Sequence, residues 1–189
     1  MSLISKGLKD SDIISQASLG NKGAYRELLR KYSNLSLAVA LARSGNRDKA
    51  RAAAADAFVE GAKELGQIPE SAPISPWIAS LTRATAAKRM GGTRRPSLTT
   101  EAAEEKIKNA IEEADESEPM TAEKKSELSL LAFGALSDDE REALCLLHLY
   151  SNKYDEIAAA MTTEASRIDE NLASARNKLA IILGPLFGK

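Results

Sequence analysis

The sequence predicts an all-α protein of two helical lobes joined by an acidic linker. Aromatic residues make up only 4% of the 189 residues, so few side chains favour strands. Glycine and proline breaks separate segments whose apolar residues recur at helical spacing. Charge is also segregated: residues 1–96 hold 16 basic and 8 acidic side chains, residues 97–130 hold 4 and 10, and residues 131–189 hold 6 and 9. We therefore expect a helical domain over 1–96, a linker over 97–130 and a second helical domain over 131–189.

The first two predicted helices lie at the start of the chain. Asp10 or Ser11 can cap a short helix, which Gly20-Asn21 stops. A long helix is then predicted over Lys22–Arg43 and ends at Gly45-Asn46. Its apolar residues recur on one face, so it should pack at the centre of the first lobe.

Two more helices complete the predicted first lobe. One spans about Arg47–Leu65, and the residues expected to face inward are Ala50, Ala54, Ala57, Phe58 and Ala62. Gly66–Ser75 carries two prolines and is predicted to be a loop. The next helix should open at Pro76-Trp77, because proline is well tolerated at a first helical position, and should stop at Gly91-Gly92.

The second lobe is predicted to contain three helices with short breaks. Ser137 and Glu140 form a capping box that opens the first, and Ser151-Asn152 ends it. A short helix over Tyr154–Met161 and a longer one over about Glu164–Leu183 follow, separated by a tight turn. A short helix, a tight turn and a longer helix form the arrangement whose last helix can enter a DNA major groove. A plain three-helix bundle is the alternative interpretation.

The stretch between the lobes is acidic. Ile107 and Ile111 favour one amphipathic helix, whereas the charge of residues 97–130 favours a solvated and weakly structured linker. We expect the two lobes to be separate helical units.

Several classes of protein are excluded by composition. One cysteine excludes an internal disulfide, and one histidine excludes a conventional His/Cys metal site. We find no catalytic triad, phosphate loop or carboxylate pair, so we expect no enzyme, no metal and no cofactor. An apolar run long enough for membrane insertion and a signal-peptide core are both lacking, so we expect a cytoplasmic protein.

Motifs in both lobes carry a resemblance to one family. The second lobe has LSDDERE at 136–142, YDEIA at 154–158 and ARNKL at 175–179. It resembles region 4 of the extracytoplasmic-function (ECF) class of bacterial RNA polymerase sigma factors. The first lobe has GNKGAY at 20–25 and WIASLTRA at 77–84 and resembles region 2 of that family.

The resemblance implies partners and contact residues. It implies that the chain binds core RNA polymerase and reads the −10 and −35 elements of promoter DNA, with Asp56 and Phe58 contacting polymerase. Further residues are predicted to bind DNA, either from the resemblance or from their charge. They are Arg83, Lys88, Arg89, Arg94, Arg95, Ser166, Arg167, Asn171, Arg176 and Lys178.

Departures from the family pattern support a second hypothesis. Ala52 and Ala55 stand where the family has an acidic residue and a glutamine, and Asp169-Glu170 replace a basic step in the recognition helix. Two carboxylates facing DNA phosphates would repel them. The alternative is a sigma-like protein-interaction module that has lost DNA reading and binds an anti-sigma factor or another regulator. A one-component helix-turn-helix repressor is weaker, since region 2 has no place in it.

Overall fold

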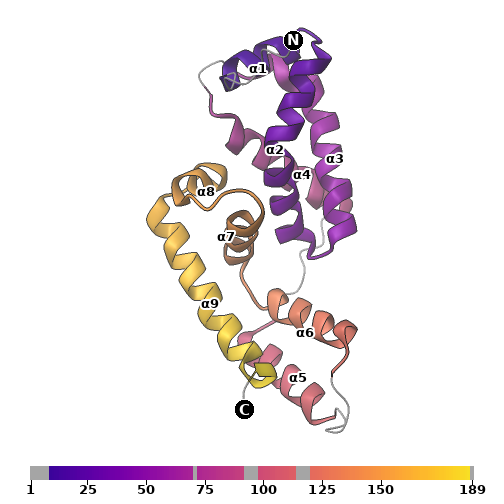
Figure 1. The fold of residues 1–189 in the computed structure, drawn as a ribbon, viewed down its shortest axis with the longest axis vertical. Helices are drawn as coiled ribbons and strands as arrows, with labels where there is room; N and C mark the ends of the chain where they lie inside the picture. The colour runs from indigo at the N-terminus through magenta and orange to yellow at the C-terminus, as the bar shows by residue number, and fades with distance from the viewer. Residues whose placement is uncertain (1–8, 70–71, 92–97, 114–119, 188–189) are drawn as a thin grey trace, which may run out of the picture.

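The computed structural model describes residues 9–69, 72–91, 98–113 and 120–187 (Figure 1). Throughout these residues the regular elements are α-helices and one short 3₁₀ turn, and no strand is present. The predicted all-α fold class is confirmed.

Four helices form the front lobe, which we define as residues 1–96: α1 (Asp10–Ser18), α2 (Lys22–Ser44), α3 (Arg47–Glu64) and α4 (Ile74–Arg89). Asparagine caps set two of the boundaries. The Asn21 side chain accepts hydrogen bonds from the first backbone N–H groups of α2, and Asn46 does the same for α3. Between these helices Gly45 takes a left-handed conformation with φ of 57°, which ends α2.

Two details of the front lobe differ from the prediction. Helix α4 begins at Ile74 instead of Pro76, because a proline in the first turn needs no intrahelical N–H partner. Ala62 was expected to face inward but is exposed, and Gly61 is buried in its place. A Cβ on Gly61 would lie 2.9 Å from the ring of Trp77, so only glycine lets α3 and α4 approach this closely.

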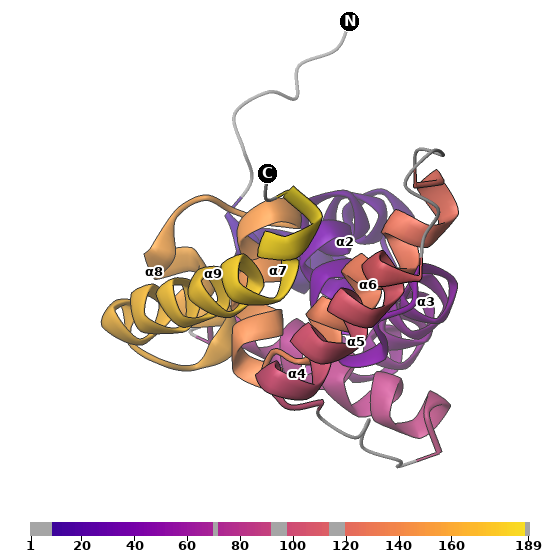
Figure 2. The same cartoon turned by 90° about the horizontal axis from the view of Figure 1, so that it is seen from below.

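The acidic stretch is more ordered than predicted. It contains α5 (Thr100–Glu112) and α6 (Ala122–Gly134), which begin at Thr99 and Thr121 caps. They lie below the front lobe in Figure 1 and therefore in front of it in the view from below (Figure 2). The expectation of a weakly structured linker is therefore wrong for these segments. Their few apolar residues cannot form a core alone, but they pack against the last part of α9. The buried members of this second core are Ala103, Ile107, Leu128, Ala132, Ala135 and Ile182.

The rear lobe, residues 131–189, contains the three predicted helices: α7 (Asp138–Leu149), α8 (Tyr154–Met161) and α9 (Ala165–Phe187). The predicted capping box is confirmed, because Ser137 and Glu140 exchange both of its hydrogen bonds. Helix α9 runs one turn beyond the predicted end at Leu183. The extra turn belongs to the segment that α5 and α6 cover.

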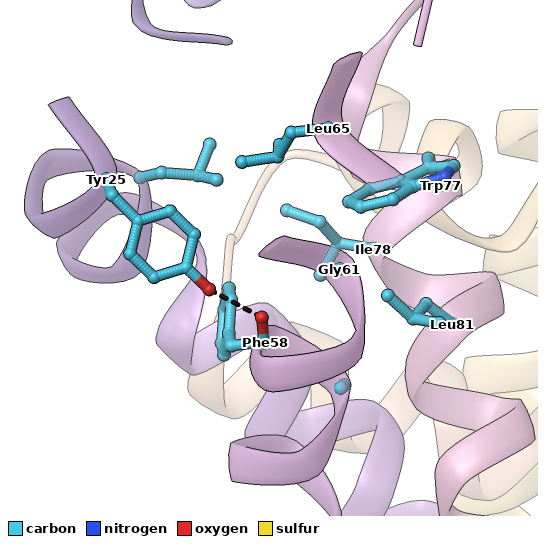
Figure 3. Close-up of a pocket in the computed structure, with 9 residues that line it drawn as sticks. Tyr25, Phe58, Gly61, Leu65, Trp77, Ile78 and Leu81 are labelled. Carbon is cyan, nitrogen blue, oxygen red and sulfur yellow. Dashed lines mark hydrogen bonds between the residues drawn. The ribbon is translucent and has the colours of Figure 1, made fainter. Parts of the chain in front are cut away.

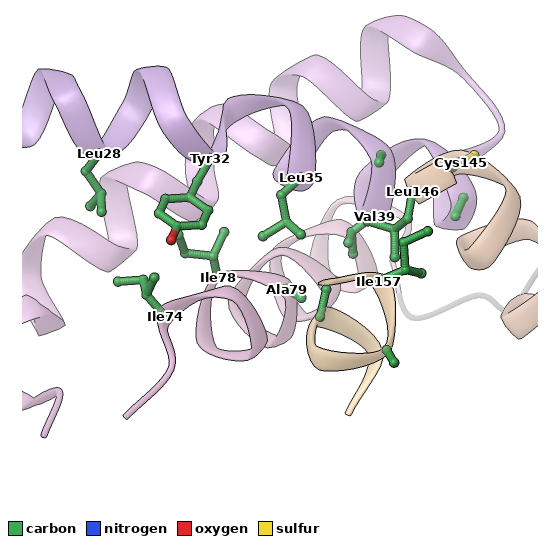
Figure 4. Close-up of a cluster of buried hydrophobic side chains, with 14 of the residues drawn as sticks. Leu28, Tyr32, Leu35, Val39, Ile74, Ile78, Ala79, Cys145, Leu146 and Ile157 are labelled. Atoms are coloured by element: carbon green, nitrogen blue, oxygen red, sulfur yellow. The ribbon is translucent and has the colours of Figure 1, made fainter. Parts of the chain in front are cut away.

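The main core of the molecule is shared by the two lobes. Helix α7 lies between α9 and the front lobe in Figure 1. Leu35 and Val39 of α2 belong to one buried cluster with Leu146 of α7 and Ile157 of α8 (Figure 4). The expectation of separate units therefore does not describe this structure, in which the rear lobe docks directly on the front lobe.

Candidate nucleic-acid and protein interfaces

The turn between α8 and α9 sets the geometry of the helix-turn-helix. Thr162 ends α8 in the left-handed region with φ of 57°, an unfavourable conformation for a β-branched residue. Ile157 of α8 and Ile168 and Leu172 of α9 are fully buried and fix the angle between the helices. This packing leaves the opposite side of the first half of α9 exposed.

The predicted reading residues on α9 do not share one environment. Ser166, Arg167 and Arg176 are exposed, and Arg167 forms an ion pair with Glu170 at 2.9 Å. Asn171, predicted to read a base, is only 8% exposed and lies on the buried side of the helix. Its amide therefore does not face solvent in this structure.

Lys178, another predicted phosphate contact, is bound within the rear lobe. Its ammonium lies 2.8 and 2.9 Å from the two carboxylate oxygens of Glu140. Glu140 also accepts hydrogen bonds from the Ser174 hydroxyl at 2.6 Å and from the Ser137 N–H at 2.7 Å. This carboxylate thus ties the start of α7 to the middle of α9.

The same contacts change the acidity of Glu140. Burial alone would raise the pKa of this carboxyl, but the hydrogen bonds from Lys178, Ser174 and the Ser137 N–H outweigh it and lower the pKa below its ordinary value. Glu140 is therefore charged at neutral pH, and its charge stabilises the packing of α9 against α7.

Arg83, the predicted promoter contact of α4, is bound at the interface between the lobes. Its guanidinium lies 2.5 Å from a carboxylate oxygen of Glu142 and donates to the carbonyl oxygen of Ala160 at 3.0 Å. Arg43 of α2 reaches the other oxygen of Glu142 at 3.3 Å and Asp138 at 3.3 Å. Glu142, 1% exposed, thus joins α7 to both α2 and α4.

Lys88, Arg89 and Asp56, three more of the predicted front-lobe contacts, lie on a partly exposed surface of α3 and α4. Arg89, predicted to bind DNA, pairs with Asp56, predicted to bind polymerase. Lys88 pairs with Glu60 at 3.2 Å. Arg94 and Arg95 lie outside the described residues.

Phe58 is packed against the core and half-buried, and it lines a small apolar cavity of about 10 Å³ between α2, α3 and α4 (Figure 3). Its backbone carbonyl accepts a hydrogen bond from the Tyr25 hydroxyl at 2.5 Å. Trp77 closes another side of the cavity. Phe58 is therefore partly a core residue, and the exposed apolar side chain beside it is Val59, at 62%.

Sequence reasoning missed Arg43 and Glu142, two of the residues that join the lobes. It selected Glu140 only as a cap of α7 and missed its ion pair with Lys178 of α9. A signal for Glu142 is present, because it stands three and four residues before Cys145 and Leu146 and therefore shares their apolar helix face. A carboxylate in such a face requires cationic partners.

Within the described residues no group of three or more histidine, cysteine or acidic side chains is arranged to hold a metal ion. None of the described helices is long and apolar enough to cross a membrane.

The chain is similar in sequence to one curated bacterial protein. No family model matches the sequence. It is 24% identical over 164 residues to the "Probable RNA polymerase sigma factor RfaY" of Xanthomonas campestris pv. campestris; the match covers 86% of this chain and 41% of that protein. The chain thus spans less than half the length of this curated relative.

The fold is also found among solved structures. In the structure of CnrH in complex with the cytosolic domain of CnrY, the matching chain aligns with a TM-score of 0.60 and 18% sequence identity. The alignment covers 93% of this chain and 97% of the other. The chain is thus similar in sequence to a probable RNA polymerase sigma factor and similar in fold to CnrH, which agrees with the sigma-factor resemblance of its motifs.

Proposed function

We propose that the chain is a cytoplasmic sigma factor, which binds core RNA polymerase and directs promoter recognition by binding and not by catalysis. The observation that carries the proposal is the pairing, in one chain, of the front-lobe helical bundle with an exposed helix-turn-helix. Sequence similarity to a sigma factor runs through both parts, since it covers 86% of the chain.

Run-off transcription tests this function directly. Purified chain and core polymerase are combined on a library of bacterial promoter fragments, with core polymerase alone as the control. We expect transcripts with defined start sites that depend on the added chain. A chain that neither binds core polymerase at any salt concentration nor starts transcripts would overturn the proposal.

A second candidate function is a sigma-like module that binds a protein regulator. It is favoured by the charge of the exposed α9 surface, where Asp169 and Glu170 are carboxylates and Arg167 is already paired. Asn171 is buried, so base reading lacks its predicted residue. CnrH, which shares the fold, was solved with the cytosolic domain of CnrY. Such a partner would present basic groups to this surface.

Replacing Asp169 by Lys and Glu170 by Ser separates the two functions. If α9 reads promoter DNA, the double variant should bind promoter DNA more tightly and keep its sequence preference. The slope of the logarithm of its binding constant against the logarithm of salt concentration should steepen by about one unit for each new phosphate contact. The matched control carries Glu123→Lys and Glu127→Ser on the exposed side of α6, which change the net charge equally. Binding is measured against promoter and scrambled duplexes at two salt concentrations. Equal gains on both duplexes would favour the protein-interaction module.

Asp56→Arg tests the polymerase contact. We expect it to weaken capture of core polymerase at least tenfold, because reversing a charge at a complementary surface costs affinity, on the order of a few kcal/mol. Since Asp56 pairs with Arg89, the Arg89→Ala variant controls for loss of that pair. Glu64→Arg, at an exposed position of the same helix, controls for the added charge. Equal capture by Asp56→Arg and Glu64→Arg would contradict the assigned contact.

A further inference from the structure

The contact between the lobes uses a residue that the proposed function needs elsewhere. Arg83 is the α4 residue assigned to promoter DNA, yet its guanidinium is bound by the Glu142 carboxylate and the Ala160 carbonyl, and its side chain is 25% exposed. The helix-turn-helix is held by the same contact, because Ala160 lies in the last turn of α8. The docked arrangement therefore withholds Arg83 from any other anion.

The chemistry of the contact suits a reversible connection. A hydrophobic residue at position 142 would hold two lobes at least as well as a buried carboxylate, which loses its hydration on docking. In the docked arrangement Arg43 and Arg83 compensate the charge of Glu142, and all three side chains can be rehydrated when the lobes separate. Arg43 is also imperfectly paired, since its two carboxylate contacts are 3.3 Å long and its buried Nε has no hydrogen-bond partner among the described residues.

We propose that Glu142, Arg43 and Arg83 form a latch that holds the rear lobe on the front lobe in a closed state, from which DNA-binding through Arg83 is excluded. The claim that the closed state excludes DNA from Arg83 rests on the proposed function, whereas the latch itself does not. Opening exposes apolar side chains of α2 and α7, such as Val39 and Leu146, so the open state becomes populated when a partner covers them. Under the proposed function that partner is core polymerase.

The only cysteine of the chain is a built-in reporter of opening. Cys145 lies three residues after Glu142 on α7, on the face that meets the front lobe, and is 7% exposed. Burial raises the pKa of its thiol to about 12, which suppresses its reactivity further. Separation of α7 from α2 would expose this thiol without unfolding either lobe.

Labelling of Cys145 by an aromatic disulfide reagent in native buffer, without DNA or polymerase, tests the latch. Glu142→Gln keeps the shape of the side chain but removes the carboxylate that binds Arg83 and one of the two that bind Arg43, so we expect labelling to accelerate about 100-fold while helical content stays unchanged. Glu127→Gln, at an exposed site of α6, should label like wild type. If Glu142→Gln does not fold, Arg43→Gln should give a smaller acceleration. Labelling that stays within about threefold of wild type, or that rises only together with global unfolding, would overturn the latch.

A second measurement separates the latch from the function. Affinity for a short fluorescent DNA duplex is compared among wild type, Glu142→Gln and the Glu142→Gln/Arg83→Gln double variant. We expect about tenfold tighter binding by the single variant and loss of that gain in the double variant. Faster labelling without a gain in DNA affinity would support the latch and overturn the DNA role of Arg83. No labelling change with normal promoter binding would overturn the latch and leave the proposed function standing.

Discussion

Leu146→Ala should lower the free energy of unfolding by about 3 kcal/mol, and it should do so for both lobes together. Leu146 is fully buried in the cluster that α7 shares with α2. Truncating a buried leucine removes its transfer free energy and leaves a cavity, which together cost about 2–5 kcal/mol. For a chain of this length the expected fall in melting temperature is about 9 °C.

The fluorescence of Trp77 makes the Leu146→Ala experiment a test of whether the two lobes unfold together. Trp77 is the only tryptophan and lies on α4 of the front lobe, whereas Leu146 lies on α7 of the rear lobe. If the lobes unfold as one unit, the fluorescence transition of Trp77 shifts with the transition measured by circular dichroism. Leu19→Ala makes the same change at a position that is 85% exposed, and should shift neither transition. A Trp77 transition unaffected by Leu146→Ala would show that the lobes unfold independently.

Local features of the fold could be predicted because the signals that fix them lie close together in the sequence. The Ser137–Glu140 box opens α7 as predicted, and Asn21 and Asn46, which were predicted to end helices, also cap the helices that follow them. Apolar spacing identified the helix-turn-helix for the same reason. The boundaries that differed, such as the start of α4, depend on how a first turn accommodates proline.

The contacts between lobes could not be predicted, because their partners are far apart in the chain. Glu142 is separated by 99 residues from Arg43 and by 59 from Arg83. Periodicity reveals that Glu142 falls in an apolar face, but it does not identify the arginines that meet it. Arg83 was consequently assigned to DNA on the strength of the family motif alone.

The acidic stretch shows the same limitation. Its charge and low apolar content are typical of a solvated segment, and these properties are unchanged in the structure. What the sequence does not show is that Ile182 of α9 supplies the missing surface for Ile107 and Leu128. A segment without a core of its own can therefore be ordered by one helix from the other end of the chain.

Glu140→Ala is expected to lower the free energy of unfolding by about 2–3 kcal/mol at neutral pH, because it removes a buried ion pair and a helix cap. The lower end of the range for buried pairs applies, because Lys178 is one-third exposed and can be rehydrated. Glu140→Gln should cost less, since an amide oxygen can still accept from Ser137 and Ser174. Glu170→Gln, which removes only an exposed pair with Arg167, should change stability by less than about 0.5 kcal/mol.

The pH dependence identifies the charge of Glu140 as the cause. Its pKa is lowered in the folded chain, so the unfolded chain binds the proton more tightly. The stabilisation is therefore complete above the unfolded pKa, near 4.5, and is lost as the pH falls through the folded value. The free energies of unfolding of wild type and Glu140→Gln, measured with urea at a series of pH values, are plotted against pH. The two plots should be parallel above about pH 6 and converge in acid. A difference in stability that persists unchanged into acid would mean that packing, and not the charge on Glu140, holds α9 on α7.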